Sequence, residues 1–180
     1  RRARLHRRVA ESLDDSDDLA EIVAEHYWNA VPVGVGARAA EALERAAEVA
    51  VRRYAYGAAQ DKLERAVRLR RAAGSGPGAQ EAELAALARL VSVRGASQGY
   101  AALVGSPLLT RGRYLAEQTG HAQELLNLLW AEWAGLDVAC EYQRADPIAD
   151  DLLALAAELD TPVSTIVGHT AVGISAWHRA

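Results

Sequence analysis

The sequence has 180 residues, of which 51% are hydrophobic and 24% are charged, and its formal net charge at pH 7 is -4. This length suffices for one domain or a short array of repeats with a buried core. The negative charge excludes electrostatic binding of nucleic acid by the chain as a whole. The single cysteine, Cys140, excludes an internal disulfide and fits a reducing cytosol. No apolar run approaches the roughly 20 residues of a membrane span, so we expect a cytoplasmic protein with no membrane partner.

The composition predicts an all-helical chain. Alanine supplies much of the hydrophobic fraction, and phenylalanine is absent. Alanine strongly favours helix but fills little core volume, so the helices should pack closely. The sequence also lacks methionine and stops within a helical pattern. We therefore expect it to be a fragment cut from a longer protein.

Helical periodicity defines the elements of the first half. Leu5, Val9 and Leu13 share one face of a first helix, which ends at an acidic run. Either Asp17 or Asp18 can cap the next helix. The expected order is a helix near 1–13, a helix at 19–30, a Pro- and Gly-containing linker at 31–36, a helix at 37–54, a turn near Tyr56 and Gly57, and a helix at 58–73.

The second half continues in the same way and shows no convincing strand pattern. Short turns between helices of this length predict antiparallel helical hairpins. The expected order is a loop at 74–78, a helix at 80–93, an irregular stretch at 95–107, a short helix at 108–118, and helices at 121–141, 145–159 and 163–177.

An internal repeat explains why small residues recur on inward positions. Small residues let two helices approach closely, and an isolated hairpin must stack on a neighbour to bury its second face. One set of repeat positions is Tyr56, Ala59, Leu63 and Ala66, and a second set with the same spacing is Tyr142, Ala145, Ala149 and Leu152.

This spacing resembles the tetratricopeptide repeat, in which an aromatic residue at the turn is followed by small, large and small residues. The resemblance covers 43–69 and 129–159, and Gly173 with the preceding valine is similar to the start of a final, truncated repeat. Trp133 and Ala149 depart from the pattern, and the middle unit is irregular. The resemblance implies an irregular right-handed superhelix of stacked hairpins.

A wider resemblance covers most of the chain. The segments RRARLHRRVAESL, LAEIVAEHYWNAVPVG, RAAEVAVRRYAYGAAQDKLERAVRL, RADPIADDLLALA and GHTAVGISAW are similar to the region after the ATPase module in large actinobacterial transcription regulators. These are the Streptomyces antibiotic regulatory proteins (SARP) and their large LuxR-type relatives. The resemblance implies that residues 1–33 end the ATPase module and that 34–180 form the repeat domain. It also implies that the full-length regulator would contact DNA only through its other domains.

The repeat pattern predicts a groove lined by first helices. In register with Tyr56, the groove residues would be Glu44, Glu48 and Arg52, and in register with Tyr142 they would be Asn127, Trp130 and Asp137. An exposed Trp130 could contact a peptide or a small ligand, and a core position between helices fits it equally well. The larger set of aromatic anchors should lie mostly in the core: Trp28, Trp130, Trp133, Trp177, Tyr27, Tyr54 and Tyr100.

No catalytic, nucleotide or metal motif is present. Lys62 is the sole lysine and follows Asp61, which excludes a phosphate-binding loop here, although an upstream domain could bind ATP. Glu21, Glu25 and His26 approach a zinc pattern, but a solvated helix surface fits them better. We expect no cofactor and no metal in this fragment.

The isolated nucleophiles and histidines also favour structural roles. Cys140 follows an apolar run and should be a buried, inert thiol. Ser106, Ser164 and Ser175 lack a nucleophile context, and we expect no acidic partner near His169 or His178. Five arginines at 1–8 could touch phosphate, but the periodicity favours a helix that docks on the ATPase module.

These features favour a non-enzymatic regulatory module that binds other proteins or neighbouring domains of the same chain. A homo-oligomer is a further possible partnership. The alternative is a small-molecule sensor with an apolar pocket between repeats. An open groove with charged walls would favour the first hypothesis, and a pocket lined by Trp and Tyr would favour the second.

Overall fold

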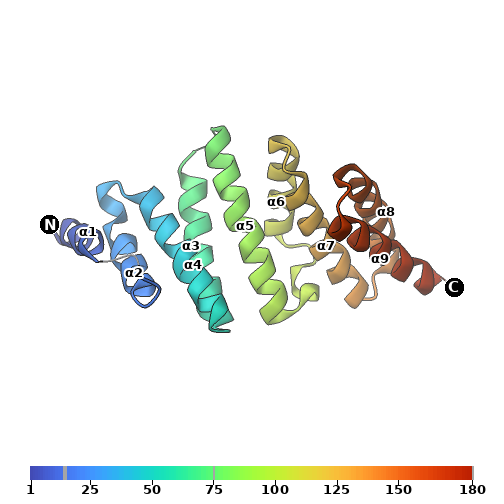
Figure 1. Cartoon of the computed structure of the whole chain (residues 1–180), viewed down its shortest axis with the longest axis horizontal. Coiled ribbons are helices and arrows are strands. Elements are labelled where there is room, and N and C mark those ends of the chain that lie inside the picture. The colour runs from blue at the N-terminus through green and yellow to red at the C-terminus, as the bar shows by residue number, and fades with distance from the viewer. Residues whose placement is uncertain (14–15, 75, 180) are drawn as a thin grey trace. The chain divides into compact units, whose positions relative to one another are not determined.

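The computed structural model describes residues 1–13, 16–74 and 76–179, and these ranges consist of helices joined by short turns (Figure 1). They contain nine α-helices and two short 3-10 helices, with no strand. The all-α prediction is therefore confirmed. The helices are α1 (Arg2–Ser12), α2 (Ala20–Ala30), α3 (Gly36–Arg52), α4 (Tyr56–Ala72), α5 (Pro77–Gln98), α6 (Pro107–Thr119), α7 (Ala122–Val138), α8 (Tyr142–Leu159) and α9 (Pro162–Arg179), and the 3-10 helices are η1 (Val31–Val33) and η2 (Tyr100–Leu103).

The chain forms two compact units, Arg1–Val93 and Arg94–Ala180. The division falls within α5. In the first unit, α2 packs on α3, and α3 packs on α4. Residues 1–33 thus fold together with the helices that follow them, and their derivation from an ATPase module stays a prediction.

Small residues hold the helices of the first unit together. Leu43 and Ala46 of α3 are buried against Ala66 of α4 and Ala24 of α2. Because alanine side chains end at Cβ, the helix backbones can approach closely around each large leucine. Ala59 and Leu63 of α4 are also buried, as their repeat positions require.

The second unit contains the same hairpin at α7–α8. Tyr54 and Cys140 are both left-handed, with φ of 59° and 60°, and each lies two residues before the tyrosine that starts the second helix. In the first hairpin, the Ala55 amide donates to the Ala50 carbonyl at 2.9 Å. In the second, the Glu141 amide donates to the Leu136 carbonyl at 2.8 Å. The two hairpins therefore share one turn geometry, whereas a right-handed superhelix stays a prediction.

Leucine and alanine also fill the core of the second unit. Leu152 and Ala149 of α8 are buried with Leu129 and Trp133 of α7. Ala145 is buried in the same cluster. Gly168 of α9 lies so close to α8 that an added Cβ would be 2.9 Å from the Ala156 Cβ.

The predicted boundaries of α5 and of the segment that follows it were wrong. Helix α5 continues to Gln98, beyond the expected end at residue 93, and 95–98 are helical rather than irregular. Gly95 lets Tyr100 pack on the end of this helix, because a Cβ at that position would be 2.7 Å from the Tyr100 ring. The missing side chain lets η2 fold back on the helix end, and the chain reverses at Gly99, which has φ of 82°.

The expectation of an aromatic core was largely wrong. Tyr54 is 80% exposed and Trp177 is 73% exposed, and Trp133 alone of the set is buried. The core volume comes from leucine instead. Four other members of the set are half-buried: Trp28, Trp130, Tyr27 and Tyr100.

No helix in the described ranges combines the length and apolar character needed to cross a membrane.

Candidate functional site

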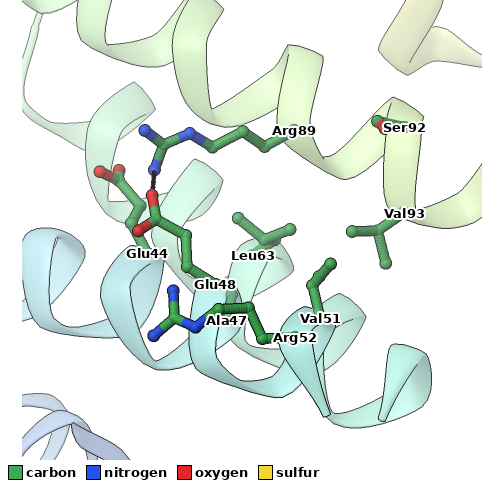
Figure 2. Close-up of a pocket in the computed structure, with 9 residues that line it drawn as sticks. All are labelled: Glu44, Ala47, Glu48, Val51, Arg52, Leu63, Arg89, Ser92 and Val93. Carbon is green, nitrogen blue, oxygen red and sulfur yellow. Dashed lines mark ion pairs between the residues drawn. The ribbon is translucent and has the colours of Figure 1, made fainter. Parts of the chain in front are cut away.

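A cleft of about 400 Å³ opens in the first unit (Figure 2). Its lining comes from α3, α4 and the part of α5 before the unit boundary. The sequence-predicted trio Glu44, Glu48 and Arg52 all line this cleft, at one-turn intervals along α3. The remaining lining residues are Ala47, Val51, Leu63, Arg89, Ser92 and Val93.

The cleft has an apolar side and a charged side. Leu63, Val51 and Val93 lie together on one side in Figure 2, and the charged groups of the glutamates and arginines lie on the other. Ala47 and Leu63 are buried, so they form a floor that water barely reaches. An apolar side chain that entered the cleft would move its own surface out of water, which is favourable at about 25 cal/mol per Å² of apolar surface.

Glu44 is fixed by a bidentate ion pair with Arg70 of α4. The Arg70 Nε lies 2.9 Å from the Glu44 Oε1, and its Nη2 lies 3.1 Å from Oε2. Both side chains are largely buried. The hydrogen bond to Glu44 raises the pKa of Arg70 further above its ordinary range. Glu44 therefore ties α3 to α4, and its carboxylate is already satisfied.

The other two predicted residues also carry compensated charges. The Arg89 Nη1 of α5 lies 2.7 Å from the Glu48 Oε1. The Arg52 Nη2 lies 2.5 Å from the Asp17 Oδ2. Both pairs are about half exposed, so each contributes at most about 1 kcal/mol and can exchange partners at little cost. The rim can thus offer either sign of charge to an incoming segment.

The sequence did not indicate the α5 wall of the cleft. Arg89, Ser92 and Val93 lie in α5, which belongs to the irregular middle unit, so no repeat register pointed to them. Ala47 and Val51 could have been found, because they lie on the same face of α3 as Glu44 and Glu48.

The second predicted trio does not form a comparable cleft. Asn127 is exposed, and Trp130 is half-buried against Trp133, with ring centroids 4.8 Å apart. The Asp137 Oδ1 lies 3.1 Å from the His178 Nε2, so the expectation that His178 has no acidic neighbour was wrong. The hydrophobic cluster of this unit includes Trp130 at its edge.

The zinc-like pattern on α2 is occupied by ion pairs. The Glu21 Oε1 lies 2.7 Å from the Lys62 Nζ, and the Glu25 Oε1 lies 2.5 Å from the Arg65 Nη1. His26 faces His6 of α1 instead, with 2.9 Å between the two Nδ1 atoms. Within the described ranges, no group of three potential ligands converges on a point.

Cys140 is exposed at the α7–α8 turn, so the prediction of a buried thiol was wrong. The sequence pattern was misleading because α7 ends at Val138, two residues earlier. A hydrogen bond to Cys140 raises the pKa of the Tyr142 phenol.

The three serines have structural roles. Ser106 caps α6 by accepting from the Leu108 amide at 3.3 Å. Ser164 is buried and donates to the Ala156 carbonyl at 3.2 Å. Ser175 accepts from the Trp133 indole at 3.3 Å.

No protein-family model matches the chain, and no curated protein matches it. The cleft geometry is therefore the main guide to function.

Proposed function

We propose that the chain is a non-enzymatic protein-interaction module, and that the α3–α4–α5 cleft binds a segment of a partner protein or of a neighbouring domain. The observation that carries the proposal is the pairing of an apolar floor, Ala47 and Leu63, with a rim of exposed ion pairs. This is the open, charged-walled groove that favours a peptide over an enclosed ligand.

The cleft defines the segment that fits it. Its apolar side takes one aliphatic or aromatic side chain beside Val51 and Val93. Its charged side takes flanking charges, because Glu48 and Arg89 can open their exposed pair to meet them. We propose a short amphipathic segment with one large apolar anchor next to charged residues.

The regulatory part of the proposal rests on the sequence resemblance. In a SARP- or LuxR-type regulator, segment binding at this cleft would bias the ATPase between two states and so control transcription. Such coupling requires a segment that binds the two states with different affinities. The ATPase and the DNA contact would lie in other domains, and this unit itself would carry no cofactor.

A small-molecule sensor is the second candidate. The cleft volume of about 400 Å³ falls in the range of ligand pockets. Its lining, however, contains neither tryptophan nor tyrosine. The aromatic walls that would favour this alternative are therefore missing from the described cleft.

Peptide selection against the whole chain tests the proposal. Twelve-residue random peptides displayed on phage are selected on the wild type and then measured by titration. Ser92→Trp fills the cleft from an exposed position on α5, and Ser97→Trp places the same side chain on an exposed position of that helix outside the lining.

We expect selected peptides with one large apolar residue beside charges. Their dissociation constants for the wild type should lie on the order of 10 µM. The constant should be at least about tenfold larger for Ser92→Trp and unchanged for Ser97→Trp. Equal binding to both variants, or no enriched peptide, would contradict the proposal.

A further inference from the structure

A second groove, of about 290 Å³, lies within the second unit between α6, α7 and α8. Leu125 and Leu129 of α7 and Leu155 of α8 provide its apolar surface. Its floor is partly buried, because Leu129 belongs to the hydrophobic core. The proposed function does not use this groove.

The walls of this groove are acidic. Glu117 of α6 and Asp151 and Glu158 of α8 line it, and all three are exposed. None of them has an ion pair among the described residues. The one cation in the lining, Arg113, is already neutralised by Glu132 of α7 at 2.8 Å. The groove therefore presents three uncompensated negative charges over a leucine floor.

Helix α1 carries a face that is complementary to this groove, with basic residues around an exposed apolar side chain. Leu5 and Val9 are 53% and 39% exposed, so this face of α1 is not covered. Arg1, Arg2 and Arg8 are also exposed and lie three or four residues from Leu5, which places them around it on one helical face. Among the described residues these three arginines have no acidic partner.

We propose that the acidic groove of one copy binds the basic face of α1 of a second copy. Leu5 would cover the leucine floor, and the three arginines would neutralise the three carboxylates. Such a contact joins different surfaces of the two copies, so it can continue head to tail.

The small size of α1 sets the strength of this contact. With 11 residues, α1 is about 16 Å long. The contact is therefore smaller than the roughly 800 Å² per partner of a stable interface. We expect weak association, with a dissociation constant on the order of 100 µM. Raising the salt from about 0.03 M to 0.5 M should weaken it at least about tenfold, because the charges are exposed and screened.

Charge-reversal variants make the test specific. Variant A carries Arg1→Glu, Arg2→Glu and Arg8→Glu, so both of its surfaces are acidic. Variant B carries Glu117→Arg, Asp151→Arg and Glu158→Arg, so both of its surfaces are basic. The substitutions lie at exposed positions, and circular dichroism checks that the helices are kept. A control variant with Asp61→Arg and Asp150→Arg changes exposed carboxylates outside the groove.

Sedimentation equilibrium of the full chain provides the readout. We expect self-association of the wild type and of the control, none of A or B alone, and association restored when A and B are mixed. A wild type that stays monomeric to about 1 mM would overturn the proposal. Association that survives in A and B but is lost in Trp177→Ser would also overturn it, because the contact would then involve the exposed face of α9.

Discussion

At the scale of single residues, the ion pair between Glu21 and Lys62 is asymmetric. The Lys62 side chain is 9% exposed, whereas the Glu21 side chain is 71% exposed. Losing either partner therefore has different consequences. A glutamate left alone stays hydrated, but an ammonium left alone stays buried and uncompensated.

We therefore predict that Glu21→Gln lowers the free energy of unfolding by about 1–2 kcal/mol. Lys62→Met should change it by less than about 0.5 kcal/mol, because methionine fills the same space without a charge. Urea denaturation at pH 7 measures both. Equal losses in the two variants would show that packing around Lys62, rather than its charge, determines the effect.

The same pair predicts a pH dependence. The hydrogen bond from Lys62 holds the pKa of Glu21 below its ordinary value of about 4.5. A carboxyl group with a lowered pKa in the folded state stabilises the fold above its ordinary pKa, and this contribution is lost as the pH falls through the folded-state value. When the pH is lowered from 6 to about 3, the free energy of unfolding of the wild type should fall more than that of Glu21→Gln. Parallel pH curves for the two proteins would contradict this assignment.

At the scale of elements, two glycines of α9 provide a matched pair. A Cβ at Gly168 would be 2.9 Å from the Ala156 Cβ and 3.0 Å from the Leu153 Cα, whereas a Cβ at Gly173 would meet nothing within 4 Å. The glycine that permits close packing is thus Gly168. Gly173, the position that the repeat pattern indicated, is exposed.

We predict that Gly168→Ala destabilises the protein by about 1–3 kcal/mol, because the contacts include backbone atoms that cannot move aside easily. Gly173→Ala should stabilise it by about 0.5–1 kcal/mol, because alanine favours helix at an open position. Thermal unfolding followed by circular dichroism compares the two variants. A destabilising Gly173→Ala would indicate that a further element covers this face.

The elements were predictable where periodicity and turn chemistry agreed. The spacing of Tyr56, Ala59 and Leu63 indicated α4 and its buried face, and the turn before Tyr142 repeats the turn before Tyr56. Trp177 was placed wrongly because an apolar neighbourhood in sequence does not reveal which side of a helix another element covers, and Cys140 was placed wrongly because α7 ends before it. The extended end of α5 packs against Tyr100 at Gly95, a tertiary contact that no local pattern reveals.

The cleft was predictable only in part for the same reason. Glu44, Glu48 and Arg52 share one face of a single helix, and sequence spacing is enough to identify such a face. Arg89 lies opposite Glu48 because of tertiary packing. Periodicity shows which residues share a face of one helix, but it does not predict an ion pair between residues of two distant segments.

At the scale of the whole molecule, the division into two compact units predicts separable stability. Leu43 is fully buried in the first unit, and Leu152 is fully buried in the second. Each of the substitutions Leu43→Ala and Leu152→Ala should lower the free energy of unfolding of its own unit by about 2–5 kcal/mol. Each one deletes buried methyl groups and leaves a cavity. Hydrogen exchange should show faster opening of α3–α4 in the first variant and of α7–α8 in the second. Loss of protection in both units from either change would show that they unfold as one cooperative body.

Nuclear magnetic resonance locates the bound segment and so tests directly whether the α3–α4–α5 cleft is the binding site. A peptide selected on the whole chain is titrated into the isotope-labelled protein, and the amide shift changes are mapped. Binding in the cleft predicts the largest changes at Ala47, Val51 and Leu63 and along 89–93, with none of comparable size in α7–α9. The largest changes in α6–α8, or changes spread evenly over the chain, would contradict the assignment of the α3–α4–α5 cleft as the binding site.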